Sequence, residues 1–319
     1  MIDCDHLFYI TAGSGIGMGH LRRSLAIAAG LKKPSKKIFF VVKGDKSAVK
    51  ILKQNGFRAV LYSKLVLSLL RPKMVIIDQK DDVSREIGSF KSKGARVCLI
   101  DNISRARLRS DIAIYPLSHL KDGMNWQGFK GKKYIGARYF PLNKEFLRSR
   151  SIKHKVFTIL VTMGGADPFG LTSRVTKALS SIGSRFRAYI VKGPAFKKQK
   201  IEEDKRFTIV NDPSSIAGLM SRSDIAITAF GTTLYELAYM GVPAVIINNY
   251  RQDAGDAGEF RKLGTSIPLG YYKDIDGRSI VKAVDSLMKN RKNLVKLSLR
   301  GRKLVDGKGT QRIVKLLKK

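Results

Sequence analysis

The chain has 319 residues, 44% of them hydrophobic, which is enough for a sizeable core divided between two domains. Its 61 lysines and arginines outnumber 25 acidic residues, and the net charge of +36 attracts nucleic acid, anionic lipid or phosphorylated small molecules. No apolar run approaches the roughly 20 residues that span a bilayer, no signal peptide opens the chain, and Cys4 and Cys98 stand in no metal or redox motif. We therefore expect a reduced, cytoplasmic globular protein.

Apolar runs typical of strands alternate with amphipathic segments of helical spacing along most of the chain. In the first half the expected strands are His6–Ala12, Lys37–Val42, Arg58–Tyr62, Met74–Asp78, Arg96–Asp101 and Ile112–Tyr115. The expected helices there are Leu21–Leu31, Lys46–Asn55 and Val83–Lys93. This alternation predicts an α/β fold with a parallel sheet, which binds ligands at the carboxyl ends of its strands.

A glycine-rich loop, residues 13–20, joins the first strand to the first helix. Gly15, Gly17 and Gly19 let the backbone approach a ligand, and the N-terminus of the following helix attracts phosphate. His20 stands where the helix begins, and imidazole suits acid/base chemistry. The alternative is a tight turn without chemistry, because the spacing matches neither a phosphate loop nor a dinucleotide fingerprint.

A polar, basic stretch at Arg148–Lys155 has the composition of a linker, so we expect domains at residues 1–150 and 151–319. Alternation then restarts, with a helix expected at Leu171–Ser180. The strands expected in the second half are Val156–Met163, Phe186–Val191, Phe207–Val210, Ile225–Thr228, Ala244–Ile247 and Ser266–Leu269.

The loop after the first strand of the second half mirrors the first glycine loop. Gly164 and Gly165 can offer backbone N–H groups to a phosphate. Asp167 either accepts a hydrogen bond from a sugar hydroxyl or caps the helix that follows.

A second helix start in this half carries Gly231, Thr232 and Thr233, which can donate to a diphosphate. Glu236, one turn later, can hold two ribose hydroxyls. The alternative makes Thr232 an N-cap and Glu236 its partner at the helix dipole. Gln252 begins a further helix at the same edge and is a candidate hydrogen-bonding side chain.

Together these motifs resemble the GT-B nucleotide-sugar proteins. More narrowly, the chain resembles the UDP-sugar hydrolases of pseudaminic acid biosynthesis and the related spore coat polysaccharide biosynthesis proteins. The matching segments occur in family order over nearly the whole length: residues 16–23, 134–139, 164–168, 231–243 and 305–309.

The resemblance implies two Rossmann-like domains that face a cleft, with the sugar on the side of the first domain and UDP held mainly by the second. In the hydrolases the histidine matching His20 is thought to position or activate water for attack at the anomeric carbon. Glu236 would bind ribose, with Thr232 and Thr233 near the phosphates, and no metal or other cofactor is implied.

One departure concerns the sugar side of the site. The hydrolases carry an Arg-x-Asp pair just before the glycines, where this chain has Thr11-Ala12-Gly13, so the resemblance does not name the sugar. Asp78, at the end of an expected strand, either contacts the sugar instead or is structural.

The resemblance gives a UDP-sugar hydrolase, with a glycosyltransferase that uses a lipid or protein acceptor as the alternative. A third hypothesis is a non-enzymatic polyanion-binding protein on the same fold. The basic segment 289–319 predicts amphipathic helices with a solvated cationic face, for which contact with an anionic membrane surface is a secondary expectation. Nucleic acid binding is not expected, because no zinc-finger or aromatic-glycine RNA motif occurs.

Overall fold

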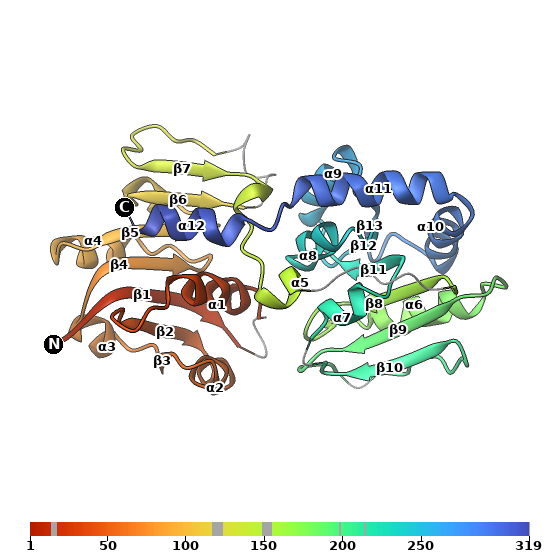
Figure 1. Ribbon diagram of the computed structural model, residues 1–319, viewed down its shortest axis with the longest axis horizontal. Helices are drawn as coiled ribbons and strands as arrows, with labels where there is room; N and C mark the ends of the chain where they lie inside the picture. Colours follow the sequence, from red (N-terminus) through yellow and green to blue (C-terminus); the bar gives the residue numbers. More distant parts are fainter. Residues whose placement is uncertain (14–17, 117–123, 149–154, 198, 214, 319) are drawn as a thin grey trace. The chain divides into compact units, whose positions relative to one another are not determined.

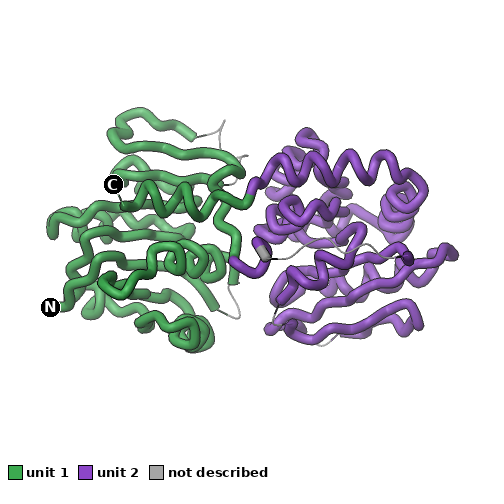
Figure 2. The backbone as a smooth tube through the Cα atoms, in the orientation of Figure 1, with its two compact units in different colours: residues 1–143, 307–319 green, residues 144–306 purple. Residues whose placement is uncertain are grey.

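The strands that the structure describes form two parallel sheets, each within its own compact unit (Figures 1 and 2). The computed structural model describes residues 1–13, 18–116, 124–148, 155–197, 199–213 and 215–318. Unit 1 comprises residues 1–143 and 307–319, and unit 2 comprises residues 144–306.

Unit 1 contains a seven-stranded sheet of order β3-β2-β1-β4-β5-β6-β7. Its strands are β1 (Ile2–Ala12), β2 (Ile38–Gly44), β3 (Arg58–Leu61), β4 (Leu70–Asp78), β5 (Arg96–Ile100), β6 (Ile112–Tyr115) and β7 (Lys132–Ile135). Its α-helices are α1 (Gly19–Leu31), α2 (Lys46–Gln54), α3 (Lys64–Leu69), α4 (Ser84–Ser92) and α12 (Gly309–Leu317), with short 3-10 turns at Arg105–Arg109 and Ala137–Tyr139.

Unit 2 contains a six-stranded sheet of order β10-β9-β8-β11-β12-β13. Its strands are β8 (Thr158–Thr162), β9 (Arg187–Lys192), β10 (Phe207–Asn211), β11 (Ile225–Ala229), β12 (Ala244–Asn248) and β13 (Ser266–Tyr271). Its helices are α5 (Lys144–Arg148), α6 (Leu171–Ser180), α7 (Ala217–Met220), α8 (Thr233–Met240), α9 (Asp253–Lys262), α10 (Gly277–Lys289) and α11 (Arg291–Leu304).

The central strands are apolar on both faces because helices cover both. In β1, Phe8 and Ile10 face a core shared with α1, α2 and α12, whereas Leu7 and Tyr9 face a second core shared with α4. Such continuous apolar runs are typical of parallel strands buried on two sides, and the predicted α/β fold is confirmed.

Two elements of unit 1, strand β7 and helix α3, were not predicted from the sequence pattern. Strand β7 begins with Lys132 and Lys133, which are exposed at the edge of the sheet, so it lacks the apolar run that marks a buried strand. Helix α3 is a single short segment with no fully buried residue.

The expected linker at residues 148–155 lies largely outside the described residues.

The C-terminal helix belongs to unit 1, although the sequence had grouped it with the second domain. Ile313 and Leu317 of α12 are buried in the core that α1 covers. Gly309, the first residue of α12, allows this approach, because a Cβ atom there would lie 2.0 Å from the Phe140 carbonyl oxygen. The chain therefore returns to the first sheet after completing the second.

We expect Gly309→Ala to lower the stability of unit 1 by about 2 kcal/mol, because the added methyl group overpacks the backbone contact with Phe140. Thermal unfolding with protease digestion of α12 measures the effect. Gly183→Ala is the control, since a Cβ atom there meets nothing within 4 Å. Equal stability of the two variants would contradict the assigned role of Gly309.

Candidate functional site

In each sheet the strand order reverses direction beside the strand that comes first in the sequence, β1 in unit 1 and β8 in unit 2. The reversal lies between β1 and β4 in unit 1 and between β8 and β11 in unit 2. Connections leave such a pair of strands toward opposite faces of the sheet, and open α/β sheets bind their ligands at the carboxyl ends of these strands. The glycine-rich loops predicted from the sequence follow β1 in unit 1 and β8 and β11 in unit 2.

In unit 1 this edge brings His20 against Asp78. His20 is in the first turn of α1, and Asp78 is the last residue of β4. Their side chains meet with 2.6 Å between His20 Nδ1 and Asp78 Oδ1. The Asp78 side chain is fully buried, whereas 20% of the His20 side chain is exposed. The pair therefore consists of a buried carboxylate and a partly exposed imidazole.

Arg23, one helical turn after His20, completes the charge network. Its Nε donates to Asp78 Oδ2 at 2.6 Å, and its Nη1 donates to Asp101, which directly follows β5. Ser24 Oγ also donates to Asp78 Oδ2, at 3.2 Å. Sequence reasoning missed Arg23 and Asp101, although the position of Asp101 after a strand is the same signal that singled out Asp78.

Burial and charge act in opposite directions on these carboxyl groups. Burial alone would raise the pKa of Asp78, but the charge of Arg23 and the hydrogen bonds from Arg23 and His20 outweigh it and hold this pKa well below the ordinary value. For Asp101, burial raises the pKa above the ordinary value, and the Asp78 charge adds to the rise. Asp78 is therefore ionised at neutral pH.

The network also determines which nitrogen of His20 can act as a base. Arg23 Nη2 lies 3.1 Å from His20 Nδ1, but the Asp78 carboxylate is closer to the same nitrogen. A proton on Nδ1 satisfies the ionised carboxylate, and the guanidinium retains its bonds to Asp78 and Asp101. This assignment leaves the lone pair on Nε2, which is the atom able to accept a proton.

The glycines of the first loop are only partly described. Gly19 is the first residue of α1. Gly15 and Gly17 lie outside the described residues.

In unit 2, Gly164 and Gly165 follow β8 and leave open space beside their backbone. A Cβ atom at either residue would meet nothing within 4 Å, and Gly164 has a φ of 80°. Gly193, after β9, packs behind them, since its Cβ atom would lie 2.5 Å from the Gly165 carbonyl oxygen. Sequence reasoning did not identify Gly193, whose role depends on this contact between loops.

Asp167 makes the hydrogen bonds of a helix cap. It accepts from the backbone N–H groups of Leu171 and Thr172 at 2.8 Å each, and from Gln199 Nε2 at 3.0 Å. The side chain is buried, and φ of 42° places the residue in the left-handed region. Of its two sequence-based interpretations, the structure shows capping.

The residues after β11 lie at the start of α8. Gly231 has open space where a Cβ atom would stand. Thr232 is the N-cap residue of α8, as the alternative interpretation predicted, but its side chain makes no capping hydrogen bond. Glu236 is buried in the first turn of α8.

Gln252, at the start of α9 after β12, is exposed. Because β8, β11 and β12 are neighbours, their loops share one edge of the sheet.

Each unit contains a pocket lined by described residues. A pocket of about 400 Å³ in unit 2 adjoins the carboxyl ends of β9 and β10 and is lined by Lys192, Gly193, Pro194, Phe196, Gln199, Asn211 and Asp212. Gly193 and Gln199 connect it to the Gly165 loop and to Asp167.

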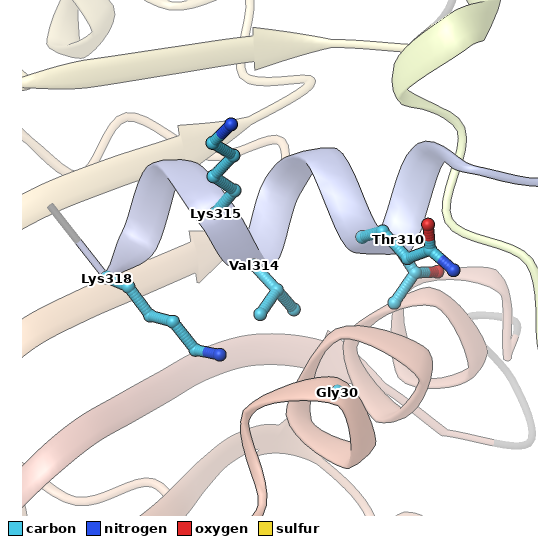
Figure 3. A pocket seen from close by; sticks show the side chains of 6 residues that line it. Gly30, Thr310, Val314, Lys315 and Lys318 are labelled. Carbon is cyan, nitrogen blue, oxygen red and sulfur yellow. The ribbon is translucent and has the colours of Figure 1, made fainter.

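A pocket of about 500 Å³ in unit 1 lies between α1 and α12 (Figure 3). Its Gly30 is at the opposite end of α1 from His20, so it is separate from the charge network.

Three non-glycine residues with positive φ follow strands at these edges: Asp101 (51°), Asp167 (42°) and Asp212 (37°). Left-handed backbone is strained for such residues and concentrates at functional sites. Among the described residues, no cluster of three or more histidine, cysteine or acidic side chains is arranged to hold a metal ion.

The comparisons with known proteins agree with the resemblance deduced from the motifs. The chain is 25% identical over 322 residues to the spore coat polysaccharide biosynthesis protein SpsG of Bacillus subtilis, covering 94% of each chain. It is 24% identical over 288 residues to a Helicobacter pylori protein named pseudaminic acid cytidylyltransferase and UDP-2,4-diacetamido-2,4,6-trideoxy-beta-L-altropyranose hydrolase. That match covers 88% of this chain and 51% of the relative.

A further relative is the uncharacterized protein MJ1062 of Methanocaldococcus jannaschii, 29% identical over 267 residues. The chain matches 54% of its length, so it spans about half of this relative and of the Helicobacter one. No protein-family model matches the chain.

Solved structures confirm the GT-B fold. MurG of Acinetobacter baumannii has a TM-score of 0.73 at 15% identity, and the match covers 98% of this chain and 99% of that one. The calicheamicin glycosyltransferase CalG4 has a TM-score of 0.69 at 12% identity, covering 100% and 98%. MnaA of Staphylococcus aureus, solved with UDP, has a TM-score of 0.67 at 11% identity, covering 98% and 96%.

We expect Asp78→Asn to lower the free energy of unfolding by about 3 kcal/mol at neutral pH, because it leaves Arg23 buried beside a neutral amide. The ionised carboxylate stabilises the fold above the unfolded-state pKa of about 4, and this contribution fades as the pH falls toward the lower folded-state pKa. In urea denaturation, the difference between wild type and variant should therefore shrink below about pH 4.

Asp81→Asn is the matched control for this variant. Asp81 forms an exposed ion pair with Lys43 at 2.6 Å, and removing it should change stability by less than about 1 kcal/mol. A buried-charge role for Asp78 is contradicted if both variants unfold at the same urea concentration.

Proposed function

We propose that the protein is a nucleotide-sugar hydrolase that releases UDP from a UDP-activated amino or deoxy sugar in surface polysaccharide biosynthesis. The observation that carries the proposal is the His20–Asp78 pair at the point where the strand order of unit 1 reverses. The names of the Bacillus and Helicobacter relatives supply the pathway class and the reaction class.

In the proposed reaction, His20 Nε2 takes a proton from a water molecule. The water oxygen attacks the anomeric carbon, and the bond between this carbon and the diphosphate oxygen breaks, so that UDP leaves with the electron pair. The Asp78 carboxylate holds the Nδ1 proton and stabilises the imidazolium that forms. Asp78 thus acts through His20, and the sequence-based alternative of direct contact with the sugar is less well supported, since the side chain is fully buried.

Unit 2 would hold the nucleotide. Backbone N–H groups of Gly164, Gly165 and Gly231 lie at strand ends and helix starts, where fixed dipoles favour a diphosphate. Thr232 and Thr233 add hydroxyl donors beside them, and Glu236 and Gln252 are the candidates for the ribose. The solved structure of MnaA with UDP shows that a protein of this fold binds the nucleotide.

A glycosyltransferase is the second candidate, because solved structures of this fold include proteins named as glycosyltransferases. The same imidazole would then remove a proton from an acceptor hydroxyl instead of from water. The two reactions differ in what they require: hydrolysis needs the UDP-sugar alone, whereas transfer needs an acceptor.

We expect His20→Ala to reduce UDP release from UDP-amino sugars at least about 100-fold, because the general base is removed. Wild type and variant are compared on a panel of UDP-sugars, with and without membrane lipid. Thermal stabilisation by UDP should persist in the variant, since His20 lies outside the proposed nucleotide-binding loops.

The outcomes separate the hypotheses. Release without lipid that disappears in His20→Ala supports the hydrolase, and release that requires lipid supports the transferase. If UDP neither is released nor raises the melting temperature, both enzyme hypotheses fail and a non-enzymatic polyanion-binding protein is left.

We expect Glu236→Gln to weaken UDP binding about tenfold, because an amide replaces a charged acceptor of hydrogen bonds. Titration calorimetry of UDP measures the effect. Glu259→Gln, on α9, is the control and should bind UDP as the wild type does. Unchanged UDP affinity in Glu236→Gln would rule out its contact with ribose.

A further inference from the structure

Helix α11 of unit 2 is labelled in Figure 1. One side of this helix carries cations around two exposed aliphatic side chains. This outer face consists of Lys292, Val295, Lys296, Leu299, Arg300 and Lys303, all of them exposed. Val295 is 50% exposed and Leu299 is 61% exposed. The spacing of three and four residues places these six side chains on one side of the helix.

The opposite face of α11 anchors the helix. Leu294 and Leu297 are buried in the core of unit 2. Gly301 allows contact with α8, because a Cβ atom there would lie 3.0 Å from the Ala238 carbonyl oxygen. A rotation of α11 that buried Val295 and Leu299 would expose the packed face, which contains Leu294, Leu297 and Gly301. Packing therefore keeps the outer face toward solvent.

Helix α11 itself contains no acidic residue. The nearest acids along the chain are Asp285 and Asp306, which lie outside α11. In the part of the chain that the structure describes, none of the four cations of the outer face forms an ion pair with a carboxylate. Their charge is therefore available to an external anion.

The aliphatic side chains distinguish between two kinds of polyanion. A nucleic acid offers phosphates and bases, which proteins bind with cations and stacked aromatic rings, and α11 contains no aromatic residue. An anionic bilayer offers phosphates above hydrocarbon, which suits cations that surround exposed Val and Leu side chains. None of the described helices could cross a bilayer, so such an attachment would be peripheral.

We propose that the outer face of α11 docks the protein on an anionic phospholipid bilayer. Lys292, Lys296, Arg300 and Lys303 bind the headgroup phosphates, and Val295 and Leu299 enter the boundary between headgroups and acyl chains. This attachment is independent of the reaction proposed above, because no residue of either candidate site belongs to α11.

Sedimentation with vesicles tests the proposal. Wild-type protein should bind vesicles of phosphatidylcholine with about one third phosphatidylglycerol at least tenfold more tightly than vesicles of phosphatidylcholine alone. Lys292→Glu/Lys296→Glu should lose at least about tenfold in affinity for the anionic vesicles. The matched control is Lys46→Glu/Lys50→Glu, which makes the same charge change on exposed positions of α2 and should lose less than about twofold.

A second variant separates bilayer docking from general attraction to polyanions. Val295→Ser/Leu299→Ser keeps every charge and should weaken binding to anionic vesicles about fivefold, while leaving retention of a single-stranded RNA oligonucleotide unchanged. Circular dichroism and melting temperature verify that each variant is folded. Equal loss in the α2 and α11 charge variants, or full vesicle binding by Val295→Ser/Leu299→Ser, would overturn the proposal.

Discussion

The buried carboxylate of Asp78 is the constraint on which the first sheet's edge depends. An ionised group without access to water is costly unless charges and hydrogen-bond donors surround it. Arg23, Ser24 and His20 all contact Asp78 and all belong to the first two turns of α1. One carboxylate at the end of β4 therefore fixes the start of the helix that follows β1, and with it the orientation of the imidazole.

Asp101 extends this constraint to a third strand. Arg23 links Asp78 and Asp101, so that the ends of β4 and β5 meet one guanidinium from α1. The different pKa directions of the two carboxyl groups follow from their partners, because Arg23 and His20 contact Asp78, whereas Asp101 has Arg23 alone and a second oxygen, Oδ1, without a hydrogen bond. Perturbed pKa values of this kind concentrate at functional sites.

The second sheet uses the same topology with different chemistry. Its edge contains glycine backbone, threonine hydroxyls and helix N-termini in place of a buried ion network, and Asp167 is occupied in capping α6. Neutral dipoles of this kind favour an anion without titrating near neutral pH. In the function proposed above, unit 1 would supply the acid/base group and unit 2 the edge that binds the diphosphate.

The sequence by itself determined the alternation of strands and helices, since a parallel strand buried on both faces must be apolar along its length. His20 and Asp78 were identifiable separately, one from its glycine loop and the other from its position after a strand. Their contact, and the parts played by Arg23 and Asp101, needed the tertiary structure, because the strand order brings together residues that are far apart in the sequence. His20 is 58 positions from Asp78, and Arg23 is 55 positions from Asp78 and 78 positions from Asp101. The return of α12 to unit 1 was likewise decided in three dimensions: an amphipathic stripe shows that a helix packs, whereas the shape of the facing surface, here Phe140 opposite Gly309, selects where it packs.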